Sequence, residues 1–225
     1  MRKDLTELVF ILDRSGSMSG LEADTIGGFN SLVEKQKKEE GEALISVVLF
    51  DDLQEVLYDR KALQTIEPMT DKQYYVRGCT ALLDALGRAI HHIGNVHKYA
   101  REEDRPGKTL FIITTDGMEN ASRRYTYEKV KQMVERQKEK YGWEFLFLGA
   151  NMDAISVAGR FGISADRAVR YECDREGTAL NYQELSRSVS VMRQSPEPTA
   201  AAAFARDAGD WANAIREDYK KRHRR

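Results

Sequence analysis

Residues 8–18 read LVFILDRSGSM, an unbroken apolar run that ends at an aspartate and continues into a loop of small polar residues. Such a run predicts a strand buried on both faces, as in a parallel sheet covered by helices. Asp13, Ser15 and Ser17 follow at alternate positions, and Gly16 allows the close bend that lets alternate side chains point the same way. We therefore expect three oxygen ligands to converge where this strand ends.

The same alternation of buried runs and amphipathic stretches continues along the chain. Apolar spacing predicts further strands at 43–50, 109–115, 143–150 and 168–172, a more polar edge strand at 53–59, and helices at 21–36, 82–93, 127–137, 155–161 and 180–192. A tight reversal at Asp51 and Asp52 makes the edge strand antiparallel to its predecessor. The pattern predicts an α/β fold with a doubly wound, mostly parallel sheet and helices on both faces, which binds ligands beyond the carboxyl ends of its strands.

The length of 225 residues favours one large domain with a tail rather than two domains. The segment SPEP at 195–198 breaks regular structure, so we expect a domain over residues 1–195 and a helical appendage with a basic end over residues 196–225. One helical face of the appendage is apolar, and we expect it to dock on the domain rather than on a partner. Its apolar residues are Phe204, Ala208, Trp211 and Ile215.

Charge and cysteine content exclude several classes of function. The chain has 35 Lys and Arg against 36 Asp and Glu, so it has no global attraction to nucleic acid or to an anionic membrane. We expect no secretory signal and no membrane span. Cys79 and Cys173 follow neither a metal-binding nor a disulfide spacing, which favours two free thiols in a reducing cytoplasm. The final KKRHRR is expected to be a solvated end.

Two further polar residues lie at the ends of predicted elements. Thr80 precedes the predicted helix at 82–93, and Asp116 follows the strand at 109–115. Taken separately, Thr80 is a favourable N-cap and an Asp before Gly is common in turns. Carboxylate and hydroxyl oxygens without a nearby thiol or imidazole favour magnesium, manganese or calcium over zinc.

Other polar residues are better explained without metal. Asp51 and Asp52 are expected to serve the turn between two strands. Asn151 and Asp153 follow the strand at 143–150 and could border a recognition surface, although Asp153 is a natural helix cap. Glu119 and Asn120 are expected at the pocket rim and not as ligands. Three histidines have no carboxylate or cysteine at ligand spacing and are expected on the surface, namely His91, His92 and His97.

At this point the chain resembles the von Willebrand factor A family, whose metal-ion-dependent adhesion site (MIDAS) has the pattern D-x-S-x-S, a distant threonine and a distant aspartate. Asp13, Ser15 and Ser17 match the first part, Thr80 in RGCTALLDAL the second and Asp116 in ITTDGMEN the third. The resemblance covers roughly residues 4–195. It implies a Rossmann-like, six-stranded sheet of order 3-2-1-4-5-6 with one antiparallel edge strand.

The resemblance also implies a function. In the family, the ion at this site is bridged by an Asp or Glu of a partner protein, so we expect a non-enzymatic, divalent-metal-dependent protein-binding module that acts as an adaptor or scaffold. Mg²⁺ is the expected ion, with Mn²⁺ or Ca²⁺ as alternatives. Intracellular family members imply a cytoplasmic protein of bacterial or phage type, and an AAA+ ATPase complex as one assembly that it could join.

Two functions of other classes remain as alternatives. A magnesium-dependent hydrolase or phosphoryl-transfer enzyme on a similar fold would use Asp13 as nucleophile. The sequence argues against it, because Ser15 stands where haloacid dehalogenase-like phosphatases need a second aspartate, and because no phosphate-binding G-x-x-x-x-G-K-[ST] loop is present. A nucleic-acid-binding role for the basic C-terminal end ranks last.

Overall fold

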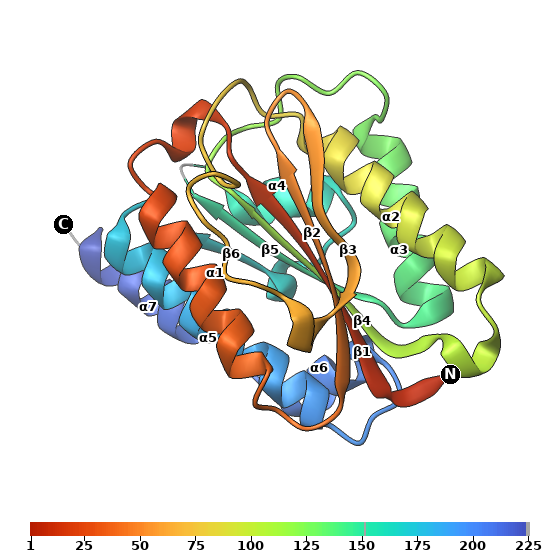
Figure 1. The fold of residues 1–225 in the computed structure, drawn as a ribbon. Helices are drawn as coiled ribbons and strands as arrows, with labels where there is room; N and C mark the ends of the chain where they lie inside the picture. Colours follow the sequence, from red (N-terminus) through yellow and green to blue (C-terminus); the bar gives the residue numbers. More distant parts are fainter. Residues whose placement is uncertain (151, 224–225) are drawn as a thin grey trace.

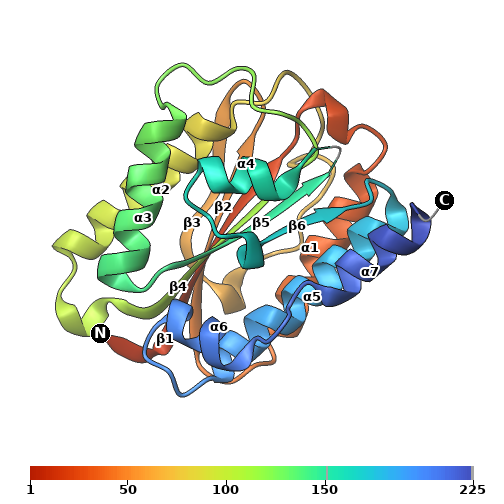
Figure 2. The same cartoon turned by 180° about the vertical axis from the view of Figure 1, so that it is seen from behind.

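The computed structural model describes residues 1–150 and 152–223, which form a six-stranded sheet between two layers of helices (Figures 1 and 2). The strands are β1 (Arg2–Asp13), β2 (Glu42–Phe50), β3 (Gln54–Ala62), β4 (Pro106–Thr115), β5 (Glu144–Ala150) and β6 (Ala168–Tyr171). The helices are α1 (Glu22–Gln36), α2 (Leu82–Tyr99), α3 (Tyr127–Tyr141), α4 (Ala154–Arg160), α5 (Arg175–Gln194), α6 (Ala200–Asp207) and α7 (Asn213–Arg222).

The strand order is β3-β2-β1-β4-β5-β6. β1 is parallel to both β2 and β4, the pairs β4–β5 and β5–β6 are also parallel, and β3 is antiparallel to β2 at one edge. The predicted fold class, including the order 3-2-1-4-5-6 and the antiparallel edge strand, is confirmed. The chain builds outward from β1 to β3 and then returns to the other side of β1 with β4. The carboxyl ends of β1 and β4 therefore flank the switch point, where folds of this type bind ligands.

The continuous apolar sequence of β1 is explained by burial on two faces. Successive side chains of a strand point to opposite faces of its sheet. Phe10 packs edge-on against Phe29 of α1, with ring centroids 5.3 Å apart, in the core that also contains α5. Ile11 belongs to the opposite core, together with Ile90 of α2. Both layers thus hold β1 in place, which fixes the position of the loop that follows it.

The C-terminal apolar stripe docks on the body of the domain, as predicted. Phe204, Trp211 and Ile215 are buried in the core on the α1 and α5 side of the sheet, and Trp211 Nε1 donates a hydrogen bond of 2.8 Å to the Asp166 carbonyl oxygen. The stripe is divided between α6 and α7 instead of forming one helix. The chain bends between them, where Gly209 has a φ of 53°, a conformation that favours glycine.

Other predictions from the sequence concern the two cysteines, membrane-spanning helices and the division into domains. Cys79 and Cys173 are free thiols, as predicted. No helix in the described part of the chain is long and apolar enough to cross a membrane. The division into a domain over 1–195 and an appendage over 196–225 stays a prediction. Asn151 and the last two residues of KKRHRR lie outside the described residues.

Candidate metal centre

The two aspartates of the candidate site come from the ends of adjacent strands. Asp13 is the last residue of β1, and Asp116 directly follows β4. The two strands are parallel and in register, with Leu12 beside Thr114. Their carboxyl ends therefore meet at the same edge of the sheet, and both aspartates are buried there, with exposures of 1% and 3%.

The loop after β1 brings its two serines to these aspartates. Ser15 donates its backbone N–H to Asp13 Oδ1 at 2.7 Å, which folds the loop back over the strand end. The Oγ atoms of Ser15 and Ser17 lie 3.1 Å apart, and Ser17 Oγ donates to Asp116 Oδ1 at 2.5 Å. Ser15 is buried and Ser17 is exposed. The expected convergence of alternate side chains is present, and Ser17 marks its open side.

Thr80 reaches the same point from the loop before α2. A Cβ atom added at Gly117 would lie 2.8 Å from Thr80 Oγ1, 3.1 Å from Ser17 Oγ and 3.7 Å from Ser15 Oγ. Three hydroxyl groups thus surround Gly117, and the missing side chain of this glycine leaves the space between them open. Any larger residue here would fill the space that a small ligand of these hydroxyls needs.

Thr80 is not the N-cap of α2, contrary to the simpler explanation of this residue. The N-cap position is Ala81, and no side chain of that residue caps the helix. The first N–H groups of α2 are instead bonded from the loop after β4, where Glu119 Oε2 accepts from Leu83 N at 2.8 Å. Asn120 Oδ1 accepts from Thr80 N at 2.9 Å. Both rim residues therefore hold Thr80 and α2 in position, and the Thr80 hydroxyl is free of helix capping.

The site places two carboxyl groups close together in a poorly solvated position. Burial is the main cause that raises the pKa of Asp13 to about 6, and the negative charge of Asp116 adds to the effect, although hydrogen bonds from Thr115 and Ser15 oppose it. Burial also raises the pKa of Asp116. Both shifts mean that ionised carboxylates are disfavoured here until positive charge is supplied.

The donor set fits a hard divalent cation. The described residues contain no group of three or more His, Cys, Asp and Glu side chains arranged for a metal. The candidate site differs from such groups because it combines two carboxylates with three hydroxyls, all of them oxygen donors. Oxygen ligands suit magnesium, calcium and manganese, and water completes the shell when side chains are few. The residues present therefore fit a hard divalent ion.

Comparisons with known proteins give structural but not sequence relatives. No protein-family model matches the chain, and no curated protein matches its sequence. Among solved structures, proximal thread matrix protein 1 from the mussel byssus, with a zinc-occupied MIDAS motif, has a TM-score of 0.56 at 16% identity over 82% of this chain and 46% of that one. A von Willebrand factor type A structure from Catenulispora acidiphila has a TM-score of 0.53 at 15% identity, over 83% and 42%. This chain has the fold of a von Willebrand factor type A domain.

A third solved structure is similar to this chain at still lower identity. A mutant of the PilB minor pilin from Streptococcus sanguinis also has the fold, with a TM-score of 0.55 at 11% identity over 89% of this chain and 63% of that one. Identities this low establish the von Willebrand factor A fold and not a shared ligand. The chain also spans less than half of the mussel and Catenulispora chains.

Several residues that hold the site in this von Willebrand factor A fold had no signal in the sequence. Thr115 Oγ1 donates to Asp13 Oδ2 at 2.6 Å, and the Tyr74 hydroxyl donates to the Asp13 carbonyl oxygen at 2.5 Å. Cys173 Sγ lies 3.6 Å from Asp116 Oδ2. Burial and the charge of Asp116 raise the pKa of this thiol to about 12. These contacts join residues that are 57 to 102 positions apart in the chain, so no local sequence motif predicts them.

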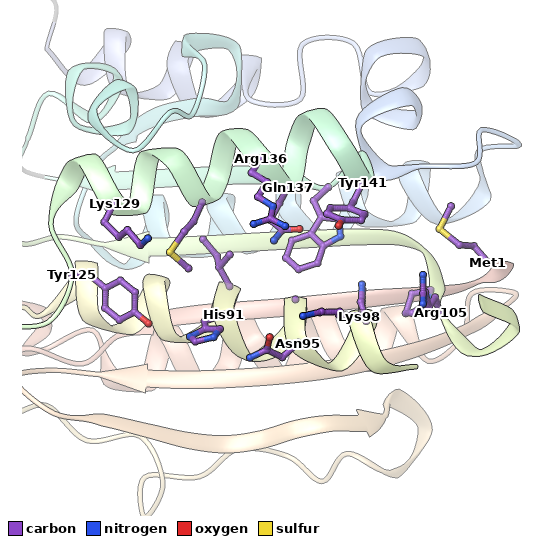
Figure 3. Close-up of a pocket in the computed structure, with 16 residues that line it drawn as sticks. Met1, His91, Asn95, Lys98, Arg105, Tyr125, Lys129, Arg136, Gln137 and Tyr141 are labelled. Atoms are coloured by element: carbon purple, nitrogen blue, oxygen red, sulfur yellow. The ribbon is translucent and has the colours of Figure 1, made fainter. Parts of the chain in front are cut away.

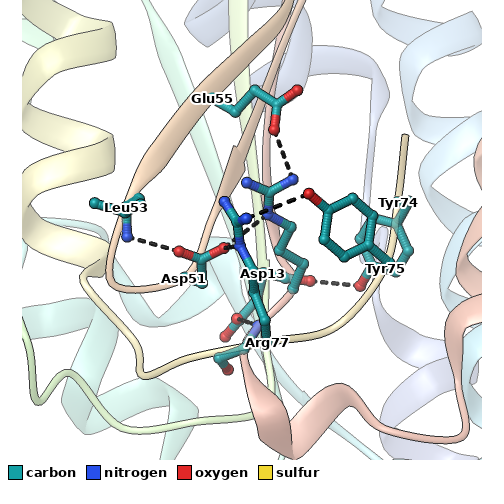
Figure 4. A network of polar contacts seen from close by, with 9 residues as sticks. Asp13, Asp51, Leu53, Glu55, Tyr74, Tyr75 and Arg77 are labelled. Atoms are coloured by element: carbon teal, nitrogen blue, oxygen red, sulfur yellow. Dashed lines mark hydrogen bonds and ion pairs between the residues drawn. The ribbon is translucent and has the colours of Figure 1, made fainter. Parts of the chain in front are cut away.

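A buried arginine supports the loop beside the site (Figure 4). Arg14 has no exposed side-chain surface, and it donates to Asp51 Oδ2 at 2.9 Å and to Glu55 Oε2 at 2.8 Å. Arg77 donates to the same Asp51 oxygen at 2.7 Å. Both guanidinium groups lie over the ring of Tyr75, at 5.3 and 5.4 Å from its centroid. The network ties the loop after β1 to the loop before α2.

Asp51 is an ion-pair and turn residue and not a ligand. Its Oδ1 accepts from Leu53 N at 2.7 Å, which is the turn role predicted for it. Burial by itself would raise the pKa of Asp51, but hydrogen bonds from Arg77, Leu53 N and Arg14 lower it below its ordinary value. Asp153 likewise caps a helix as predicted, because its side chain accepts from Ser156 N at the start of α4.

Proposed function

We propose that this chain is a divalent-cation-dependent protein-binding module that serves as an adaptor or scaffold. One observation carries the proposal: three hydroxyls from two loops lie around Gly117, and the buried carboxylates of Asp13 and Asp116 are hydrogen-bonded to the serine loop at the same edge of the sheet. The donors would be Asp13, Ser15, Ser17, Thr80 and Asp116. Chance rarely gathers five oxygen donors at a switch point where ligands of such folds bind.

Mg²⁺ is the proposed ion, with Mn²⁺ and Ca²⁺ as the nearest alternatives. When bound, the ion supplies an electrophilic position that a carboxylate of a partner can occupy. Two of the five donors carry negative charge, so a divalent ion keeps an affinity for a third carboxylate. The mussel matrix protein has been solved with a zinc-occupied MIDAS, which supports a metal at the corresponding place here. For this reason Zn²⁺ is included among the ions to be titrated.

The rim of the site supports an acidic partner. Gly16 N donates to the Gly78 carbonyl oxygen at 3.1 Å, so the loop that carries Arg77 lies directly beside the serine loop. The Arg77 side chain is 41% exposed, and its neighbour Tyr75 is 42% exposed. Arg77 Nε is paired with Asp51, and the exposed remainder of its guanidinium group would attract the Asp or Glu that completes the proposed coordination. A cytoplasmic location and an AAA+ ATPase complex are further parts of the proposal.

A non-enzymatic role is supported by the environment of Asp13. Both of its carboxylate oxygens accept hydrogen bonds, from Ser15 N and Thr115 Oγ1, and the residue is 1% exposed. A nucleophilic carboxylate needs an oxygen that can approach a substrate. The side chain instead has the arrangement expected of an anchored ligand.

The test begins with calorimetric titration of chelated protein with Mg²⁺, Mn²⁺, Ca²⁺ and Zn²⁺. We expect heat of binding from the wild type and none from Asp13→Ala. The matched control is Asp71→Ala, which removes an exposed aspartate outside the site and is expected to bind like the wild type. Absence of binding in folded wild-type protein, or equal binding by Asp13→Ala, would overturn the metal site.

The protein-binding part needs a second measurement. Immobilised wild type and Asp13→Ala are each exposed to cell extract with Mg²⁺ or with chelator, and retained proteins are identified by mass spectrometry. We expect partners retained by the wild type in Mg²⁺ and lost in the other three conditions. Partners retained equally in all four conditions would mean that the site, even if it binds metal, does not serve recognition.

A further inference from the structure

The helices α2 and α3 lie on the opposite side of the sheet from α1 and α5 (Figure 1), and a groove runs between them (Figure 3). Its volume is about 600 Å³, and it extends lengthwise between the two helices, with Tyr125 toward one end and Arg105 toward the other. Small-molecule sites commonly have volumes of about 300–1,000 Å³. Its lining includes none of the five proposed metal ligands.

The groove has an apolar floor with a defined shape. Trp143 is 3% exposed and stacks on Phe111, with ring centroids 5.4 Å apart. Ile90 and the partly buried Met133 extend the apolar surface. Gly94 of α2 lets the side chain of Gln137 lie close across the groove, because a Cβ atom at Gly94 would be 3.2 Å from Gln137 Nε2. Trp143 and Ile90 thus lie almost fully buried beneath the groove, and the partly buried Met133 and Tyr125 supply apolar surface along it.

Its walls are strongly basic, although the whole chain has a net charge of −1. No Asp or Glu is among the described residues that line the groove. Four of its cationic side chains form no ion pair with any described residue, namely Lys98, Arg105, Lys129 and Arg136. Arg105 Nε donates to the Ala100 carbonyl oxygen and Lys98 lies over the Tyr99 ring, but neither contact neutralises a positive charge. Unpaired cations around an apolar floor are complementary to a ligand that is apolar along its body and negatively charged at its head.

His97 belongs to the support of this groove and is not the surface residue predicted from the sequence. Its Nε2 lies 2.5 Å from Oε2 of the fully buried Glu7, whose other oxygen accepts from Arg60 at 2.6 Å. The His97 ring also contacts Trp143 edge-on, with centroids 5.3 Å apart. Both oxygens of Glu7 are thus already paired, so this carboxylate does not neutralise the four cations of the groove.

From this arrangement we infer that the groove between α2 and α3 binds a linear amphipathic carboxylate, of the kind represented by a medium-chain fatty acid. The aliphatic chain lies along the apolar floor between the helices, and the carboxylate pairs with the unpaired cations. An elongated groove favours a linear body over a compact one. The groove shares no lining residue with the proposed metal centre. Its test can therefore fail without affecting the proposed function, and the reverse also holds.

The test is calorimetric titration of the full chain with dodecanoate below its micelle concentration, in chelator. The double variant Lys98→Glu with Arg136→Glu is expected to bind roughly tenfold more weakly, because each change turns an attraction at short range into a repulsion. The matched control is Lys140→Glu, an exposed lysine of α3 outside the groove, which is expected to bind like the wild type. Raised salt is expected to weaken wild-type binding.

A steric variant tests whether dodecanoate binding requires the space of the groove or only the positive charges around it. Gly94→Leu places a side chain into the groove against the flexible end of Gln137 and favours helix, so the protein is expected to fold and to lose dodecanoate binding. Uncharged dodecyl maltoside is expected to bind more weakly than dodecanoate. The inference is overturned if dodecanoate does not bind, if Gly94→Leu binds it unchanged in a protein with wild-type circular dichroism, or if the uncharged amphiphile binds equally.

Discussion

Replacing Asp13 by Asn is expected to have opposite effects on stability with and without a divalent ion. Asn keeps the shape of the side chain, and its oxygen can still accept from Ser15 N. Thr115 Oγ1 now donates to Asp13 Oδ2 and lies 3.1 Å from the Gly117 carbonyl oxygen. It can therefore accept from the new amide nitrogen and donate to that carbonyl instead, which leaves the buried groups hydrogen-bonded.

The magnitude follows from the pKa of Asp13. Its rise from 3.8 to about 6 corresponds to about 3 kcal/mol, at ~1.4 kcal/mol per pKa unit. A carboxyl group with a raised pKa in the folded state holds its proton more tightly when folded, so ionisation favours unfolding. The penalty is absent below pH 3.8, grows between pH 3.8 and about 6, and is complete above that range. Without metal at pH 7, Asp13→Asn is therefore expected to raise the free energy of unfolding by up to about 3 kcal/mol.

With metal the sign is reversed. A ligand at a thousand times its Kd stabilises the folded state by about 4.1 kcal/mol. This exceeds the gain of about 3 kcal/mol from the substitution, so at that excess of Mg²⁺ the variant is expected to be less stable than the wild type by about 1 kcal/mol. The assay is urea unfolding of the wild type and Asp13→Asn in chelator at pH 4, 5.5 and 7, and in Mg²⁺ at pH 7. Asp71→Asn serves as the control for loss of an exposed negative charge. Equal unfolding free energies for wild type and Asp13→Asn in chelator at pH 7 would refute the reasoning.

Three further predictions concern the surroundings of the site. Gly117→Ala is expected to abolish Mg²⁺ binding in calorimetry, because its Cβ would lie 2.8 Å from one hydroxyl of the site; unchanged affinity would contradict the assigned position of the ion. Arg14→Ala is expected to lower the free energy of unfolding by about 3 kcal/mol, because it leaves a buried aspartate short of a partner; a loss below about 1 kcal/mol in urea unfolding would contradict this. Iodoacetamide at pH 8 is expected to label the exposed Cys79 well before Cys173, whose pKa of about 12 keeps it a thiol; peptide mass spectrometry that finds equal rates would count against it.

Local sequence pattern was sufficient for most of the architecture. The run LVFILD at residues 8–13 has no alternation, and the structure explains this by burying Phe10 and Ile11 in different cores. The charged strand at the edge and the turn role of Asp51 also follow from neighbouring residues. The C-terminal stripe was correctly expected to dock, but its division into α6 and α7 depends on a glycine bend that apolar spacing alone does not reveal.

The sequence was less informative about how side chains are held. Thr80 has the position of an N-cap, yet Glu119 and Ser122 from the loop after β4 bond the first N–H groups of α2. His97 has no carboxylate near it in sequence, yet Glu7 lies against it from β1. In each case the partner comes from a strand or loop that becomes a neighbour only when the sheet is assembled.

The sequence by itself determined the strands, the helices and the sheet class, because burial periodicity and turn chemistry depend on residues close together in the chain. The candidate ligands followed from the resemblance of its motifs to the von Willebrand factor A family. Tertiary structure decided that Ser17 lies 2.5 Å from Asp116, 99 residues away, and that Asp13 is buried deeply enough to raise its pKa to about 6. It also decided that α2 and α3 enclose a basic groove. Distances and desolvation of this kind arise only when distant segments pack together, so neighbouring residues alone do not reveal them.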